Sequence, residues 1–76
     1  MEKKLAIRGH RTRGAEVIKA LEELGGKNNY SHGGRSERNI YFVDKNNEID
    51  YMPLTIKNID KFYQIYTLDE YLKSLQ

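Results

Sequence analysis

The chain has 76 residues, 38% of them hydrophobic, and it carries a formal net charge of +2 at pH 7. This length allows one domain with one small core, so residues 1–76 are expected to fold as a single unit. The absence of cysteine excludes disulfides and thiolate metal sites, and no apolar run approaches the roughly 18 residues of a membrane span. We therefore expect a cytoplasmic protein with no membrane partner, and a homo-oligomer, because so small a domain is marginal alone.

A strand and an amphipathic helix are expected in the first third of the chain. Alternating apolar residues predict a short strand that ends at Gly9. Through residues 13–24, apolar residues recur at three- and four-residue spacing, which predicts the helix. Thr12 is its expected N-cap. Gly25 is expected to end the helix, because glycine takes the left-handed backbone conformation without strain.

The middle of the chain predicts a polar loop followed by a β-hairpin. Residues 27–38 form the loop, which is rich in Asn, Ser and Gly. Residues 39–44 are typical of a strand, residues 45–48 of a turn, and residues 49–52 of a second, shorter strand. Pro53 limits this second strand at its end or places it at a sheet edge.

The last part of the chain predicts a further strand and a closing helix. Residues 54–61 fit either a helical turn or a loop that dips into the core, whereas residues 62–66 are typical of a strand. Thr67 and Glu70 match a capping box at the start of a helix over residues 68–75. The predicted fold is therefore α+β: a small, mainly antiparallel sheet of three to four strands with two helices on one face, in the order β-α-β-β-(β)-α.

All five arginines and both histidines lie in two short segments, residues 8–14 and 32–38. The first segment lies where a strand turns into a helix, and the unpaired N–H groups and dipole of a helix start favour an anion. Arginine is also well suited to bidentate contact with phosphate. The candidate ligand-binding residues are Arg8, His10, Arg11, Thr12, Arg13, Tyr30, His32, Arg35 and Arg38. Among them, Tyr30 is expected to stack on a base.

The basic segments also have simpler interpretations. Arg8, Arg11 and Arg13 can remain solvated or pair with acids such as Glu16. The second segment is either a lid or second clamp over the same ligand, or a connection without fixed structure. The two histidines fit hydrogen-bonding loop residues better than a metal or acid–base pair, because the sequence places no third ligand near them.

Enzyme motifs are missing from the sequence. The first segment has neither the Gly-x-x-x-x-Gly-Lys-Ser/Thr order of a Walker A loop nor the Gly-x-Gly-x-x-Gly order of a dinucleotide-binding turn. Ser31 and Ser36 lie near His32 in the sequence, but a flexible loop does not hold a nucleophile and its base in a triad. We therefore expect a protein that is not an enzyme and that needs no cofactor or metal.

The chain resembles small uncharacterised proteins of gut bacteria and their phages in four segments, residues 8–14, 16–18, 21–28 and 66–72. The shared pattern is Arg-Gly-His-x-Thr-Arg-Gly, followed by Leu-Glu-x-Leu-Gly-Gly-Lys-Asn. The resemblance implies a phage-associated origin and a place in the host cell cytoplasm. By analogy of class, it implies an anti-defence binder, used in immune evasion, that blocks a host protein or sequesters a nucleotide signal. It carries over no catalytic or binding residue.

The distribution of charge favours a binding function for the basic segments. Residues 1–38 carry nine Lys and Arg against five Asp and Glu, whereas residues 39–76 carry four against six. We expect a binder of a phosphate-bearing small molecule, such as a nucleotide, whose second segment comes from the same chain or from a neighbouring subunit. The alternative is a basic module that docks on nucleic acid or on an acidic host protein. The small net charge and the lack of a recognition helix weigh against this alternative.

Overall fold

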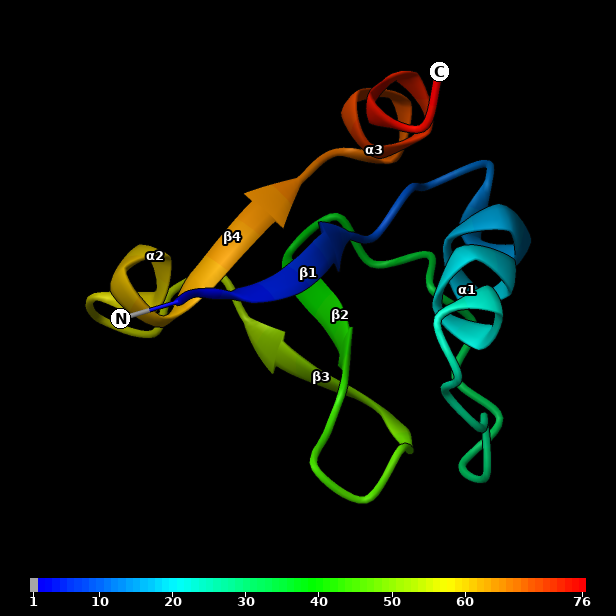
Figure 1. The fold of residues 1–76 in the computed structure, drawn as a ribbon, viewed down its shortest axis with the longest axis horizontal. Coiled ribbons are helices and arrows are strands. Elements are labelled where there is room, and N and C mark those ends of the chain that lie inside the picture. Colours follow the sequence, from blue (N-terminus) through cyan, green and yellow to red (C-terminus); the bar gives the residue numbers. More distant parts are fainter. Residues whose placement is uncertain (1) are drawn as a thin grey trace.

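The computed structural model describes residues 2–76, and it has the α+β architecture expected from the sequence (Figure 1). The elements in chain order are β1 (Lys4–Arg8), α1 (Gly14–Glu23), β2 (Asn39–Val43), β3 (Ile49–Pro53), α2 (Ile59–Phe62), β4 (Tyr63–Tyr66) and α3 (Leu68–Ser74). The sequence left residues 54–61 open between a helical turn and a loop. A short helix, α2, forms there, and it includes Phe62, which was expected to begin the strand.

Strand β1 lies inside the sheet, whose strand order is β3-β2-β1-β4. It pairs antiparallel with β2, where Ile7 faces Tyr41, and parallel with β4, where Lys4 faces Tyr63. Strands β2 and β3 form the predicted antiparallel hairpin, and β3 ends at Pro53 on a sheet edge. The sheet is therefore mixed, with two antiparallel pairs and one parallel pair.

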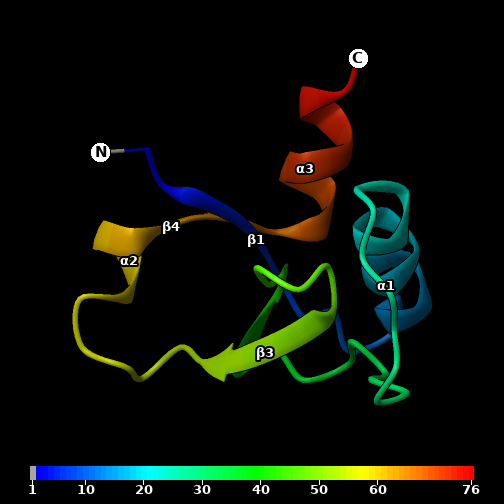
Figure 2. The same ribbon diagram turned by 60° about the horizontal axis from the view of Figure 1, so that its bottom comes forward.

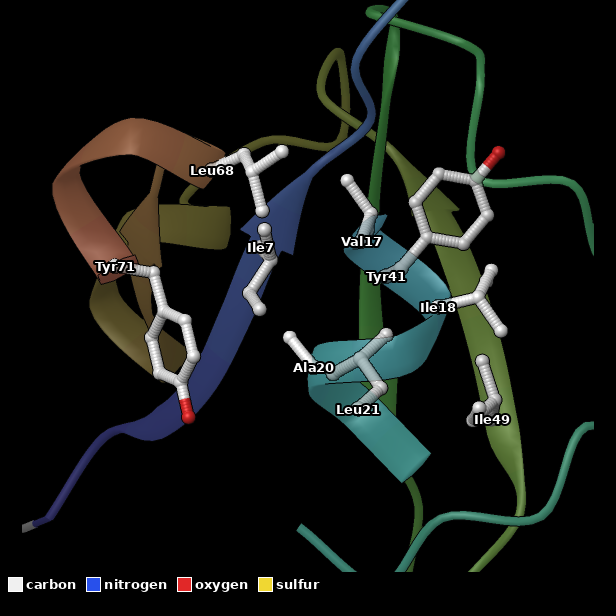
Figure 3. Close-up of a cluster of buried hydrophobic side chains, with 9 residues drawn as sticks. All are labelled: Ile7, Val17, Ile18, Ala20, Leu21, Tyr41, Ile49, Leu68 and Tyr71. Carbon is white, nitrogen blue, oxygen red and sulfur yellow. The ribbon is translucent and has the colours of Figure 1, made fainter. Parts of the chain in front are cut away.

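The larger core fills the space between one face of the sheet and the helices α1 and α3 (Figure 3). Side chains on this face belong to alternate strand positions, as the pleat of a strand requires. The buried members are Ile7, Val17, Ile18, Ala20, Leu21, Tyr41, Ile49, Leu68 and Tyr71. The apolar stripe that predicted α1 is thus the stripe that packs on the sheet.

A smaller core covers the opposite face, so the expectation of helices on one face only is wrong. Ala6, Ile40 and Phe42 lie on this side, and Ile59 of α2 packs with them. Figure 2 shows α2 on one side of the sheet and α1 and α3 on the other. The sequence pattern did not indicate this layer because α2 has only four residues and one buried side chain.

The start of α1 also differs from the expectation, because the N-cap residue is Arg13 and not Thr12. No side chain of the described residues caps the helix, and the ring of His10 instead accepts hydrogen bonds from the residues just before it. Its Nδ1 accepts hydrogen bonds from the backbone N–H groups of Thr12, at 3.2 Å, and of Arg13, at 3.1 Å. A histidine just before the turn therefore holds the backbone that leads into α1.

The other helix boundaries follow local signals in the sequence. Gly25 has φ +96° and ends α1 in the left-handed conformation. At the start of α3, the N–H of Glu70 donates to Oγ1 of Thr67 at 3.2 Å, and the N–H of Thr67 donates to the Glu70 carboxylate at 2.9 Å. The apolar faces predicted for α1 and α3 each extend one residue too far. Leu24 follows the end of α1 and is 47% exposed, and Leu75 follows the end of α3 and is 62% exposed.

Candidate anion-binding site

The two basic segments, which we call the first loop (residues 8–14) and the second loop (residues 32–38), lie against each other beside the carboxyl end of β1 (Figure 1). The N–H of His10 in the first loop donates a hydrogen bond to the carbonyl oxygen of Gly34 in the second, at 2.9 Å. One chain therefore supplies both halves of the candidate site.

Glycines allow the two loops to approach this closely. A Cβ atom at Gly9 would overlap the carbonyl oxygen of Ser36. A Cβ atom at Gly14 would overlap the carbonyl oxygen of Gly33 and lie 2.9 Å from the backbone nitrogen of Arg35. Swinging the second loop away as a lid would separate these contacts and break the backbone hydrogen bond between the loops. The packing therefore favours a second loop that stays in place over one that opens as a lid.

Four of the five arginines line one hollow on the surface of the loops, which we call the arginine hollow. Its volume is about 570 Å³, and its walls are Arg8, Arg11, Arg35, Ser36, Glu37 and Arg38. Within residues 2–76, none of these arginines forms an ion pair with a carboxylate. Nε of Arg8 donates to the backbone carbonyl of Glu37 at 2.7 Å, which holds one guanidinium group at the wall. The hollow thus gathers four positively charged residues and one negatively charged residue, Glu37.

Arg13 takes no part in the arginine hollow, because two carboxylates hold its guanidinium group. Nε lies 2.6 Å from Oε2 of Glu16, and Nη1 lies 2.6 Å from Oδ1 of Asp69 in α3. The hydrogen bonds to Glu16 and to Asp69 raise the pKa of Arg13, and the same hydrogen bond from Arg13 lowers the pKa of Glu16. The structure therefore shows Arg13 paired with Glu16, which was the simpler of the two interpretations of this residue.

His10 and Thr12 lie beside the arginine hollow and do not line it. Oγ1 of Thr12 is 3.3 Å from Nδ1 of His10, on the capping side of the ring. His10 lines a second hollow of about 250 Å³, which shares Arg8 and Glu37 with the larger one. Because Nδ1 serves as the acceptor at the start of α1, only Nε2 of His10 is left to meet a ligand.

Tyr30 and His32 belong to a separate aromatic cluster. The ring centroid of His32 lies 5.9 Å from that of Tyr30, 5.3 Å from that of Tyr51 and 6.3 Å from that of Tyr41. Nε2 of His32 is buried and has no hydrogen-bond partner among residues 2–76. Glu48 raises the pKa of Tyr30 through its charge and a hydrogen bond. None of these four rings borders the arginine hollow.

Two residues of the arginine hollow, Ser36 and Glu37, were missed by the sequence reasoning. A signal was present, because both stand between Arg35 and Arg38 in the chain. A tight loop that presents both arginines to one hollow also brings the residues between them to its wall. The contact role of Gly14 had no such signal, because it depends on the path of the second loop.

Comparison with known proteins does not assign the chain to a family. No protein-family model, curated protein or solved structure matches the chain. Over residues 2–76, no group of three or more His, Cys, Asp or Glu side chains is placed to hold a metal ion. In the same described part of the chain, no helix has the length and apolar character needed to cross a bilayer. Function must therefore be inferred from the arginine hollow itself.

Proposed function

We propose that the arginine hollow binds a phosphate-bearing small molecule, such as a nucleotide, and that the protein holds this ligand without changing it chemically. The supporting observation is that Arg8, Arg11, Arg35 and Arg38 meet at one hollow without a carboxylate partner among the described residues. Guanidinium groups match phosphate through paired N–H donors. Four guanidinium groups that form no ion pair in the described part of the chain also repel one another, and a bound anion relieves this repulsion.

The size of the arginine hollow supports a small ligand. Its volume of about 570 Å³ lies within the range of small-molecule sites, which is roughly 300–1,000 Å³. Both loops come from one chain, so the proposal does not need a neighbouring subunit. Self-association remains a separate prediction, and the mass of the particle in solution tests it.

Thermal unfolding in the presence of ligands tests the proposed function. Millimolar ATP, GTP, cyclic dinucleotides, ADP-ribose or pyrophosphate should raise the Tm of the wild-type protein if it binds the folded state. The double variant Arg11→Ala/Arg38→Ala should lose this rise. The matched control Lys19→Ala/Lys73→Ala removes two positive charges from exposed positions outside the hollow and should keep it. A Tm that responds to none of these ligands would refute the proposed function.

We further propose that the biological role is to sequester a nucleotide signal of host defence, for which the resemblance to small phage proteins is the support. A sequestering protein lowers the free concentration of its ligand and returns it intact. Ligand released by heating the complex should therefore have its original mass by mass spectrometry. Hydrolysed ligand would show that the protein is an enzyme instead.

Nucleic acid is the second candidate ligand, because all four arginines of the hollow are exposed to solvent. A gel-shift series with a mixed-sequence oligonucleotide at two salt concentrations separates the candidates. Binding that weakens steeply with salt and that ATP does not displace would favour nucleic acid.

A further inference from the structure

We propose that the arginine hollow selects its ligand by the number of phosphate groups and not by the nucleobase. This inference rests on the proposed function and specifies the ligand class of the same site. The residues that line the hollow are four arginines, Ser36 and Glu37. None of the wall residues is aromatic, and none is Asn or Gln. Bases are recognised through stacking on rings and hydrogen bonds to their edges, so these walls offer a base little to bind.

The two exposed tyrosines, Tyr30 and Tyr51, are engaged elsewhere. Tyr30 contacts His32, and its pKa is raised by Glu48. Tyr51 lies against both His32 and Tyr41, with ring centroids 5.3 and 6.0 Å apart. Moving Tyr30 or Tyr51 to the arginine hollow would break this cluster. The expectation that Tyr30 stacks on a bound base therefore has no geometric support.

The start of α1 does not supply the anion contacts that its sequence position suggested. The N–H groups of Thr12 and Arg13 donate to the ring of His10. Gly14 and Ala15, which begin the helix, do not line the arginine hollow. Recognition therefore falls to the guanidinium groups. A single phosphate group carries a charge of only about −1.5 to −2 at pH 7, which does not balance four arginines, whereas a chain of phosphates carries more negative charge.

Glu37 provides a specific test of recognition by charge. Its backbone carbonyl accepts the hydrogen bond from Arg8, and Glu37 is the one acidic residue among those that line the hollow. The carboxylate repels phosphate oxygens, and this repulsion grows with the charge of the ligand. Glu37→Gln removes the negative charge and keeps the backbone carbonyl. It should strengthen tripolyphosphate binding by about two- to fivefold, with a smaller effect for single phosphate.

Isothermal titration with phosphate, pyrophosphate, tripolyphosphate, ATP and GTP tests this inference. Affinity should rise along the first three ligands, by about tenfold or more in total, and ATP, GTP and tripolyphosphate should agree within about threefold. Glu37→Gln should strengthen tripolyphosphate binding. The matched variant Glu23→Gln, which removes the same charge from the exposed side of α1, should not.

The outcomes separate the failure of this inference from the failure of the proposed function. If ATP binds and tripolyphosphate does not, or if ATP and GTP differ by more than about tenfold, base recognition is present and the inference is wrong, while the proposed function stands. If none of the five ligands binds, the inference is wrong, and the proposed function is wrong as well if cyclic dinucleotides and ADP-ribose also leave the Tm unchanged. Binding of a single-stranded oligonucleotide that tripolyphosphate cannot displace would also overturn the inference, because it would show that the hollow requires a polymer.

Discussion

The substitution Gly14→Ala tests helix propensity against loop packing, because the two predict opposite changes in the stability of the protein. Gly14 is the first residue of α1, and alanine is favoured over glycine in helices by about 0.5–1 kcal/mol. Propensity alone therefore predicts a more stable protein. In the structure, the added Cβ would overlap the carbonyl oxygen of Gly33 and lie 2.5 Å from Cγ of Arg35.

The packing term should exceed the propensity term, because the obstructing atoms include backbone that cannot rotate away. Forcing an extra carbon into a filled site costs about 1–3 kcal/mol, so we expect a net destabilisation of about 1–2 kcal/mol for Gly14→Ala. In a domain of this size, that loss lowers the Tm by roughly 5–15 °C. The displaced second loop should also weaken ligand binding, since Arg35 and Ser36 line the arginine hollow.

Urea and thermal unfolding followed by circular dichroism measure the effect of Gly14→Ala. The matched control is Gly33→Ala in the facing loop, where an added Cβ meets no atom within 4 Å and φ is not positive. This control should be neutral or slightly stabilising, because alanine reduces the entropy of the unfolded chain. A Gly14→Ala protein as stable as the wild type or more stable would show that the loops do not pack as described.

Substitutions at three further positions test local features of the fold. His10→Ala removes the acceptor for two backbone N–H groups and should lower the free energy of unfolding by about 1 kcal/mol in urea titration; unchanged stability would contradict a stabilising role for these hydrogen bonds. The lowered pKa of Glu16 means that its carboxylate stabilises the fold above the ordinary pKa of 4.5, a contribution that is lost as the pH falls below this value. Glu16→Gln should therefore flatten the loss of stability in acid, and an unaltered pH profile would argue against the ion pair. Asn47 has φ +61°, so Asn47→Ala should destabilise the hairpin by roughly 1 kcal/mol, whereas Asn47→Gly should preserve the Tm; equal effects of the two would refute backbone strain as the cause.

The elements with local signals could be predicted from the sequence. The apolar period of α1, the glycine that ends it and the capping box of α3 each lie within a few residues of the structure they produce. The hairpin is also local, since Asp44 accepts hydrogen bonds from the N–H groups of Asn46 and Glu48 through its side chain. The positions of these elements can therefore be predicted from residues a few places apart in the chain.

Features that depend on distant partners could not be predicted in this way. Arg13 looked like a member of the anion site, but its guanidinium group is held by Glu16 and by Asp69, which is 56 residues further along the chain. Tyr30 is close to the second loop in sequence, yet it lies by Glu48 of the hairpin. The convergence of Arg8 and Arg11 with the second loop also needs the folded chain, because only the β1–β2 pairing brings the loops together.

Because β1 lies inside the sheet, its two neighbouring strands become available at different times during synthesis. Strands β1, β2 and β3 can pair as soon as they leave the ribosome, because they follow one another in the chain with only α1 and loops between them. The other side of β1 has no partner until Tyr63–Tyr66 has been translated. Prematurely terminated products would therefore carry an open backbone edge along β1, and an open edge promotes association between nascent chains.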